Sequence, residues 1–224
     1  MQVVRGMPVT FPVPPTPATL AWLSGEKPRH VLHGHDDDVT CVAVSSEVNT
    51  VLSGSRDGTV IVYSLRSGQY LLTIQHPASS AVDLVALASN GWIAICSHED
   101  RQLHSYTINH KPGRPPLASV DVHERLAAIS FSSASDVLFT AGDDGVVRLR
   151  RTHDLGLLHE LRVASEESPG GPGPLRCLTL STAEDFVLAG TQRGTICVWS
   201  ARPSAAASSG ADGLLYATSW STLT

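Results

Sequence analysis

Short segments in which apolar residues alternate with small or polar residues recur along the chain. The segment LSGSRDGTVIVYS, from Leu52 to Ser64, predicts two strands joined by a tight turn at Arg56-Asp57-Gly58. Similar alternation predicts strands in VTCVAVS (Val39–Ser45), LAAISFS (Leu126–Ser132) and LRCLTLS (Leu175–Ser181). The pattern therefore predicts β-hairpins.

The hairpin at Asp57 is one of four related units. Aligned on the turn, three further units start at Asp100, Asp144 and Arg193. The intervals between successive units, counted from Asp57, are 43, 44 and 49 residues. The Pro/Gly-rich insert at 168–174 accounts for the longer last interval. A period of 40 to 45 residues that holds several short strands is typical of β-propeller blades. We therefore expect an all-β fold of about four blades.

The repeats resemble WD40 repeats. Gly34-His35 precedes one strand and Asp57 lies in the turn after the next, while Tyr63-Ser64 and Trp199-Ser200 stand at the Trp-Asp position of that family. The second and third units lack the Gly-His pair and are supported by the spacing of Asp100 and Asp144. The resemblance implies a partial WD40 propeller, which we expect to be part of a larger one because WD40 propellers usually have about seven blades.

A more specific resemblance covers residues 27–200. HGHDDDVTCVAVSSEVNTVLSGSRDGTVIV, FTAGDDGVVRLRRTHDLGLLHEL and FVLAGTQRGTICVWS are similar to the last repeats of neurobeachin-like BEACH-domain proteins. In that family the repeats end a very large scaffold with the BEACH domain upstream. The resemblance implies that this chain is the C-terminal part of such a protein.

The repeats set the expected boundaries. Residues 1–17 are proline-rich and predicted to be disordered, and residues 18–29, which include Trp22, are expected to be the remnant of a preceding blade. Residues 30–200 hold the repeats, with blades expected at about 30–66, 70–109, 117–153 and 157–200. Residues 201–224 begin as a small-residue linker, and Leu214–Ala217 is a candidate outer strand of the last blade.

Composition favours a globular cytoplasmic protein. A net charge of −5 without a block of like charges argues against nucleic-acid binding. No apolar run is long enough to span a membrane, and the N-terminus lacks a signal-peptide h-region. The chain contains four cysteines, Cys41, Cys96, Cys177 and Cys197, none in a C-x-x-C pair, and we expect buried, reduced thiols.

One constellation resembles a hydrolytic triad. His35, Ser53 and Asp57 are the residue types that relay protons to a nucleophile. The WD40 resemblance implies instead a structural hydrogen-bond set of the Gly-His imidazole, a strand Ser or Thr, the turn Asp and the following aromatic. We expect the structural role for these three residues and for Tyr63, Asp100, Asp144 and Trp199, with Ser53 or Ser55 as the hydroxyl partner.

Metal and cofactor sites are not expected. His33, His35 and Asp36–Asp38 have ligand side chains at close spacing, but the repeat already explains His35, and an acidic run is more simply a solvated loop. His98, Glu99, Asp100 and His104 are expected in turns and at the surface. The chain lacks a phosphate-binding loop, and nothing supports an enzyme.

Arginines are the candidate partner-binding residues. Arg148 and Arg150 share a face of one predicted strand, and Arg101 and Arg193 lie at turns of the neighbouring units. A basic strip on one rim is suited to an acidic or phosphorylated peptide. The alternative is a solvated face that Asp143, Asp144 and Asp154 neutralise.

These features predict a non-catalytic protein-interaction platform. Its expected partners are proteins or peptides, together with upstream BEACH and WD40 segments of a longer chain, or a second copy that completes the propeller. The BEACH resemblance implies a role in vesicle trafficking and membrane-protein sorting, with indirect association at the cytosolic face of endomembranes. The alternative is a WD40 adaptor or substrate receptor in another complex, such as a ubiquitin ligase.

Overall fold

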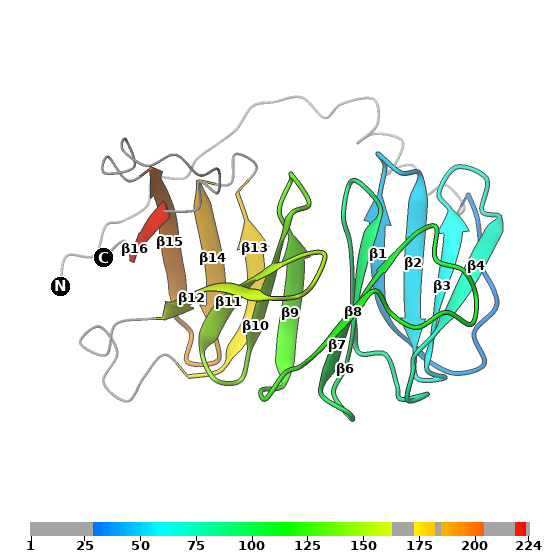
Figure 1. Ribbon diagram of the computed structural model, residues 1–224, viewed down its shortest axis with the longest axis horizontal. Coiled ribbons are helices and arrows are strands. Elements are labelled where there is room, and N and C mark those ends of the chain that lie inside the picture. Colours follow the sequence, from blue (N-terminus) through cyan, green and yellow to red (C-terminus); the bar gives the residue numbers. More distant parts are fainter. Residues whose placement is uncertain (1–28, 163–172, 182–184, 204–217, 223–224) are drawn as a thin grey trace. The chain divides into compact units, whose positions relative to one another are not determined.

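A computed structural model describes residues 29–162, 173–181, 185–203 and 218–222 of the chain. Contacts divide the chain into two units, Met1–Leu32 and His33–Thr224, and the second contains all of the strands (Figure 1). The predicted disordered segment 1–17, most of the predicted blade remnant at 18–29, and most of the insert at 168–174 lie outside the described residues.

The described strands form four antiparallel four-stranded sheets, each with its strands in chain order. The first sheet contains β1 (Val39–Ser45), β2 (Thr50–Ser55), β3 (Thr59–Ser64) and β4 (Tyr70–Gln75). The second contains β5 (Leu84–Leu87), β6 (Trp92–Ser97), β7 (Gln102–Thr107) and β8 (Ala118–Asp121). The third contains β9 (Leu126–Phe131), β10 (Val137–Gly142), β11 (Val146–Arg151) and β12 (Leu157–Arg162). The fourth contains β13 (Leu175–Leu180), β14 (Phe186–Thr191), β15 (Ile196–Pro203) and β16 (Thr218–Thr222).

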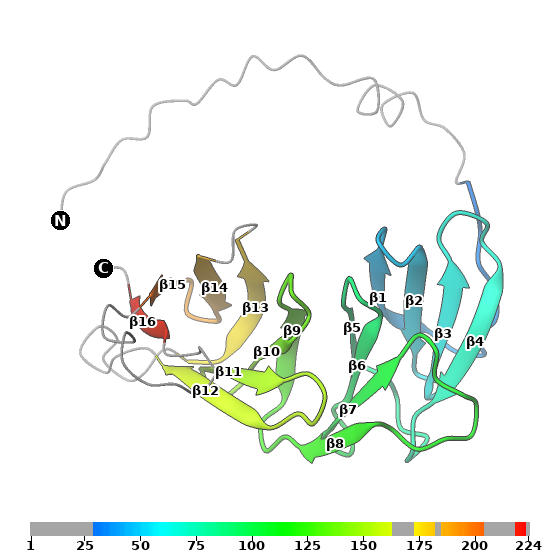
Figure 2. The same cartoon turned by 45° about the horizontal axis from the view of Figure 1, so that its top comes forward.

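The sheets pack on one another in chain order, as the blades of a propeller do. The first strands are neighbours, β1 beside β5, β5 beside β9 and β9 beside β13 (Figure 2). Each hairpin turns where the sequence pattern predicts it, with Gly58, Gly145 and Gly194 at positive φ in the β2–β3, β10–β11 and β14–β15 turns. The described residues contain no helix, and therefore no helix that could span a membrane. The chain is therefore an all-β partial propeller.

Three apolar clusters fill the spaces between neighbouring sheets. One cluster joins the first and second sheets around Leu52, Val60 and Tyr106, and another joins the second and third around Leu103 and Leu138. The third, around Val147 and Trp199, joins the third and fourth sheets. These clusters account for the alternation seen in the sequence, because the inner strands bury a side chain on each of their two faces.

The sheets differ from the expected repeat blocks by one strand. Tyr70–Gln75 was placed at the start of the second block, but it pairs with β3 and completes the first sheet. β8 and β12 complete the second and third sheets in the same way. In the fourth sheet the outer strand is Thr218–Thr222, which pairs with β15, while the candidate outer strand Leu214–Ala217 lies outside the described residues.

Candidate functional site

A buried polar network links the loop before β1 to the β2–β3 hairpin. His35 Nε2 lies 2.7 Å from Ser53 Oγ, and His35 Nδ1 lies 3.0 Å from Asp57 Oδ2 and 3.1 Å from Thr59 Oγ1. Gly34, at φ +151°, leaves the room that this arrangement needs, since a Cβ there would lie 3.0 Å from Ile61 and 3.2 Å from the Tyr63 hydroxyl. The Gly-His pair is thus explained by backbone conformation and close packing.

The geometry distinguishes the two serines that the sequence left open. Ser53 bonds the imidazole of His35, whereas the Ser55 hydroxyl donates to the Asp37 carbonyl at 3.2 Å and accepts the Asp57 amide at 3.1 Å. The Tyr63 hydroxyl donates to the His33 carbonyl at 3.0 Å. The phenol therefore fixes the backbone just before Gly34.

The Ser53, His35 and Asp57 contacts have the connectivity of a hydrolytic triad, because the serine meets Nε2 and the carboxylate meets Nδ1. A nucleophile must also reach a substrate. Ser53 is only 9% exposed, and the side chain of His35 only 6%. The cavities at Tyr106, Phe131 and Leu158 are lined by other residues. The structural role remains the better interpretation.

A serine-to-alanine variant tests that interpretation. We expect Ser53→Ala to lower the free energy of unfolding by about 1–2 kcal/mol, because His35 Nε2 loses its buried partner. Ser55→Ala is the comparison variant, because it removes a neighbouring hydroxyl that is hydrogen-bonded only to backbone atoms and not to His35. Urea unfolding of both variants measures the effect, and an ester-hydrolysis activity that disappears in Ser53→Ala at unchanged stability would favour the enzyme.

The Asp57 carboxylate is strongly stabilised in its charged form. Burial alone would raise its pKa, but hydrogen bonds from the Thr59 hydroxyl, the Asp36 and Thr59 amides and His35 outweigh burial and lower the pKa to about 2. The unfolded carboxyl titrates at 3.8. Stability from Asp57 is therefore fully present above this value and is lost as the pH falls toward 2.

We expect the difference in unfolding free energy between wild type and Asp57→Asn to be constant from pH 7 to about 5 and to shrink between about pH 4 and 2. The variant is the proper comparison because the other carboxyl groups are present in both proteins. Their contributions to the pH dependence therefore cancel in the difference in unfolding free energy. Urea unfolding at a series of pH values measures it. A difference that does not change with pH would show that the Asp57 charge contributes nothing.

The second sheet has a histidine equivalent to His35, which the sequence analysis missed. His76 lies in the segment before the second sheet, as His35 lies in the segment before the first. Its Nε2 lies 3.6 Å from Oδ2 of Asp100, the turn residue equivalent to Asp57. The residue before it is Gln75, so the Gly-His signal was absent. The expectation that His104 lies at the surface is wrong, because it is 4% exposed and its ring lies 4.8 Å from that of His76.

In the third sheet an arginine takes over the bridging role. Arg148 on β11 donates to Glu124 at 2.7 Å, to Asp144 at 2.6 Å and to Glu160 on β12 at 3.0 Å. Burial alone would lower the pKa of Arg148, but Asp144, Glu124 and Glu160 outweigh it and raise the pKa. Arg148 is therefore committed to contacts within its own sheet and its preceding loop.

This geometry contradicts the predicted basic strip. The Arg148 side chain is 15% exposed and paired, and Arg150 is 8% exposed with Nη1 donating to the Leu155 carbonyl at 3.2 Å. Neither guanidinium is presented to a partner. The neutralised face, our alternative, fits better, although Glu124 and Glu160 join Asp144 in place of Asp143 and Asp154.

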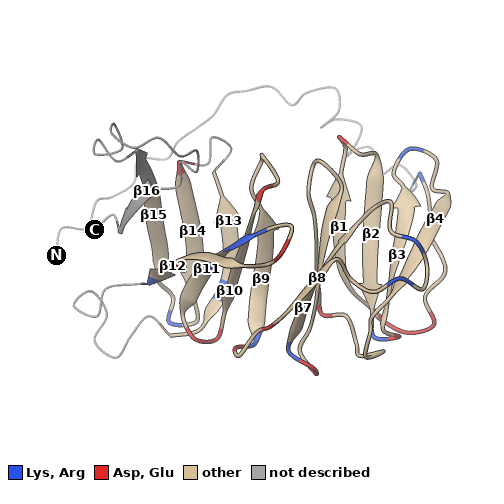
Figure 3. Cartoon of the chain, viewed as in Figure 1, with Lys and Arg blue, Asp and Glu red and all other residues tan. Residues whose placement is uncertain are grey.

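Arg101 and Arg193 lie at turns, as expected. Arg101 adopts a positive φ of 54°, as glycine does at the equivalent turn position of the other three sheets, and its Nη1 is 3.5 Å from the His123 carbonyl. Arg193 precedes Gly194 in the β14–β15 turn. Figure 3 shows acidic and basic segments interspersed along the ribbon of the described residues. The role of these two arginines in partner binding stays a proposal.

Residues at matching positions show that the first sheet has an uncovered face. Pairing with β2 places Val42 opposite Ser53, as pairing with β6 places Val85 opposite Ile95. Val85 is 9% exposed because it packs against the first sheet, whereas Val42 is 70% exposed. Val44 is 62% exposed, while Leu87, its counterpart, packs in the same cluster. As far as the described residues go, the face of β1 that lies away from the second sheet is thus apolar and exposed.

The fourth sheet has an uncovered face of the opposite kind. Ile196 on β15 pairs with Gly190 as Val60 on β3 pairs with Gly54, yet Ile196 is 73% exposed and Val60 is fully buried. The equivalent Leu103 and Val147 are also fully buried. The fourth sheet therefore carries an apolar face on the side where each earlier sheet meets its successor.

The exposure of the cysteines shows the same difference between the first and fourth sheets. Cys41 is half-buried, because Val82, which precedes β5, and Val85 on β5 lie where the Cys41 thiol approaches Gly54. Cys177, at the same repeat position, is exposed, which corrects the expectation that the thiols are all buried. Cys96 and Cys197 are buried, and burial raises the pKa of Cys96 to about 12.

Solved structures resemble the whole arrangement of sheets. The β-propeller domain of Cps50 (Swd1) from Myceliophteria thermophila aligns with a TM-score of 0.61 at 18% identity, over 80% of this chain and 56% of that one. The computationally designed Ika4 protein aligns with a TM-score of 0.59 at 24% identity, over 76% of this chain and 95% of that one. At these identities the likeness supports the propeller fold alone.

Sequence comparison identifies the relatives. "BEACH domain-containing protein B" of Arabidopsis thaliana is 34% identical over 175 residues, which are 78% of this chain and 6% of that protein. "BEACH domain-containing protein lvsE" of Dictyostelium discoideum is 25% identical over 185 residues, 78% of this chain and 8% of that protein. The chain thus spans less than a tenth of these relatives. Residues 20–207 match the family described as the neurobeachin beta propeller domain, and the chain belongs to that family.

Proposed function

We propose that this chain is part of the protein-interaction platform of a longer BEACH protein, in which further blades cover its two open faces. The observation that carries the proposal is the exposure of Val42 and Ile196 at positions whose counterparts in neighbouring sheets are buried. Apolar sheet faces of this kind mark packing surfaces. The small share of its relatives that the chain spans supports further blades as the covering elements.

The platform binds proteins or peptides and performs no chemistry of its own. The one triad-like set in the described residues is enclosed, and its members are engaged with one another and with the hairpin backbone. The net charge of −5 and the interspersed charges in Figure 3 disfavour a nucleic-acid partner. No described feature favours the alternative role as a ubiquitin-ligase substrate receptor.

We extend the proposal to a role in vesicle trafficking and membrane-protein sorting, which the resemblance of the repeats to neurobeachin-like BEACH proteins implies. In this proposal the protein is cytoplasmic and reaches endomembranes indirectly, as a peripheral component held by its partners. The propeller supplies the rigid surface on which those partners assemble.

An antibody to residues 141–162 tests the proposal in cells that express the gene. We expect a polypeptide much larger than 224 residues, found partly in a membrane fraction and released by alkaline carbonate. A band of 224-residue size would overturn the longer scaffold. Normal delivery of membrane proteins to the cell surface after depletion would overturn the trafficking role and leave the scaffold standing.

A further inference from the structure

Three metal-ligating side chains meet between the first and second sheets. His76 follows β4, Asp100 lies in the β6–β7 turn and His104 lies on β7. One ligand atom from each residue lies within 4.8 Å of the others. Among the described residues, these three form the group of His, Cys, Asp or Glu side chains that is close enough together to share an ion.

The buried nitrogens of this cluster lack partners. The His76 side chain is fully buried, and neither of its ring nitrogens has a hydrogen bond. His104 Nε2 is likewise buried and without a hydrogen bond. His35, the equivalent of His76 in the first sheet, has both nitrogens bonded. A repeated structural His–Asp pair therefore explains the first sheet but leaves three polar atoms of the second sheet unexplained.

We propose that His76, Asp100 and His104 bind a divalent transition-metal ion, with Zn²⁺ as the ion that best fits two imidazoles and one carboxylate. Such a set supplies three protein ligands, and solvent completes a tetrahedral shell. The inference concerns a site within the fold and stands independently of the proposed trafficking role.

The distances are compatible with such a shell after small side-chain rotations. Zn–N and Zn–O bonds of about 2.0–2.1 Å at tetrahedral angles place ligand atoms about 3.3 Å apart. His76 Nε2 and Asp100 Oδ2 are already 3.6 Å apart. The remaining separations are at most 4.8 Å, and binding requires rotation of the two imidazoles, which face each other edge to face.

Neighbouring groups hold two of the ligands in a suitable orientation. His104 Nδ1 lies 2.8 Å from Ser119 Oγ on β8, which leaves Nε2 directed to the cluster. Asp100 Oδ1 accepts the Gln102 amide at 3.1 Å, which leaves Oδ2 toward His76. Outer contacts of this kind are typical of metal sites, because they fix the ring and the carboxylate.

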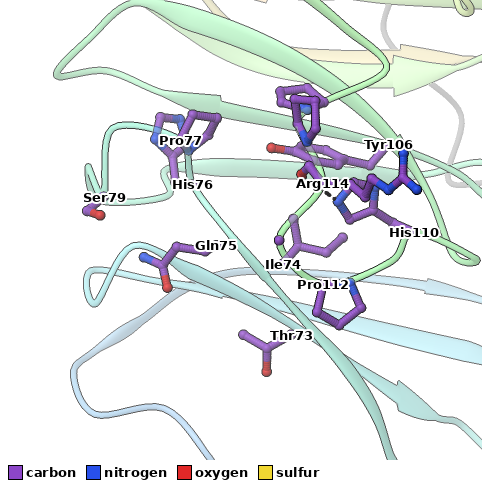
Figure 4. A pocket seen from close by; sticks show the side chains of 13 residues that line it. Thr73, Ile74, Gln75, His76, Pro77, Ser79, Tyr106, His110, Pro112 and Arg114 are labelled. Atoms are coloured by element: carbon purple, nitrogen blue, oxygen red, sulfur yellow. Dashed lines mark hydrogen bonds between the residues drawn. The ribbon is translucent and has the colours of Figure 1, made fainter.

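The three ligands differ in exposure. The Asp100 side chain is 22% exposed, whereas His76 is fully buried and His104 is 4% exposed. His76 also lines a cavity of about 400 Å³ together with Tyr106, His110 and the segment around Pro112. Figure 4 shows the His76 ring at this cavity beside Pro77, with Tyr106 and His110 close to each other.

Titration of the full 224-residue chain with Co²⁺ and Zn²⁺ tests the site. A Cys177→Ser background removes the exposed thiol as a competing ligand. We expect one equivalent of Co²⁺ to give the visible d–d bands of a four- or five-coordinate ion, without a thiolate charge-transfer band, and Zn²⁺ to displace it. Absent d–d bands or a thiolate band would overturn the site.

Two variants and a matched control locate the ion. His104→Asn places its amide near Nδ1 and so keeps a donor for Ser119 while it removes Nε2, and Asp100→Asn removes the charge. Each should weaken Zn²⁺ binding at least 10-fold, since even outer-shell changes cost about 10- to 100-fold. His153→Asn is the control, because His153 Nε2 also lies 3.6 Å from a carboxylate, that of Asp154, but is exposed.

Unchanged affinity in His104→Asn would overturn the proposal, as would an equal loss in His153→Asn. Where a variant unfolds, X-ray absorption of the Zn²⁺-loaded Cys177→Ser protein decides. A shell of two imidazoles with oxygen ligands at about 2.0–2.1 Å supports the site, and any sulfur ligand, or a shell of oxygens alone, contradicts it.

Discussion

Replacement of Arg148 by alanine is expected to lower the free energy of unfolding by about 3–5 kcal/mol, the typical cost of removing one partner of a buried ion pair. The reason is that Glu124, whose side chain is 7% exposed, loses its 2.7 Å partner, while Asp144 and Glu160 repel each other across the gap. Urea unfolding of the variant measures the loss.

Arg151→Ala is the matched control for Arg148→Ala. Arg151 is three residues along the same strand and pairs with Asp154 at 2.6 Å, but the two side chains are 41% and 44% exposed. An exposed pair is worth about 0–1 kcal/mol, so this variant should be nearly neutral. Equal small effects of both substitutions, with loss of a bound partner only in Arg148→Ala, would restore Arg148 as a binding residue.

The second large effect is expected at Val85, and it is compared with Val42, which holds the equivalent position in the first sheet. Val85→Asp should destabilise the protein by about 3–5 kcal/mol, because it removes a buried apolar side chain and places a carboxyl group between the first two sheets. Val42→Asp should change stability by less than about 0.5 kcal/mol, because Val42 is already 70% exposed. Thermal and urea unfolding of both variants provide the comparison.

The same pair of variants separates stability from association. Val42→Asp should reduce self-association of the chain, since it places a charge on the open apolar face of β1. If Val42→Asp were as destabilising as Val85→Asp, the β1 face would be covered within this chain, and the proposal of further blades would lose its basis.

The repeat pattern could be predicted from sequence because each hairpin carries its own local signal. Turn residues such as Asp57-Gly58 and Asp144-Gly145, with alternating strands around them, depend on local backbone geometry alone. The fourth strand of each of the first three sheets was assigned to the following block, because pairing with the preceding strand is a tertiary property. Tyr70–Gln75 has no local feature that indicates its partner β3.

The site could be predicted only where the family pattern is intact. His35, Ser53 and Asp57 stand at the expected spacing, and the structure brings them into contact. His76 was missed because Gln75 replaces the glycine that marks such a histidine, and its packing does not require a positive φ before it. A search for histidines about 41 residues apart, the interval between His35 and His76, would have found it.

Arg148 was misjudged for a different physical reason. Strand alternation shows that Arg148 and Arg150 share a face, but two of the three acidic residues that neutralise Arg148 come from the loop before β9 and from β12. Glu124 is 24 residues away in sequence, so its approach depends on how the sheet folds. Charge partners at that separation leave no periodic signal in the sequence.

Sedimentation velocity of the 224-residue chain over a range of concentrations tests the central claim, that two apolar faces of an incomplete propeller are open. We predict concentration-dependent association of the wild type, head to tail because the two faces differ, and a monomer of unchanged stability for Val42→Asp combined with Ile196→Asp. A wild-type chain that stays a monodisperse, cooperatively unfolding monomer at all concentrations would contradict the claim.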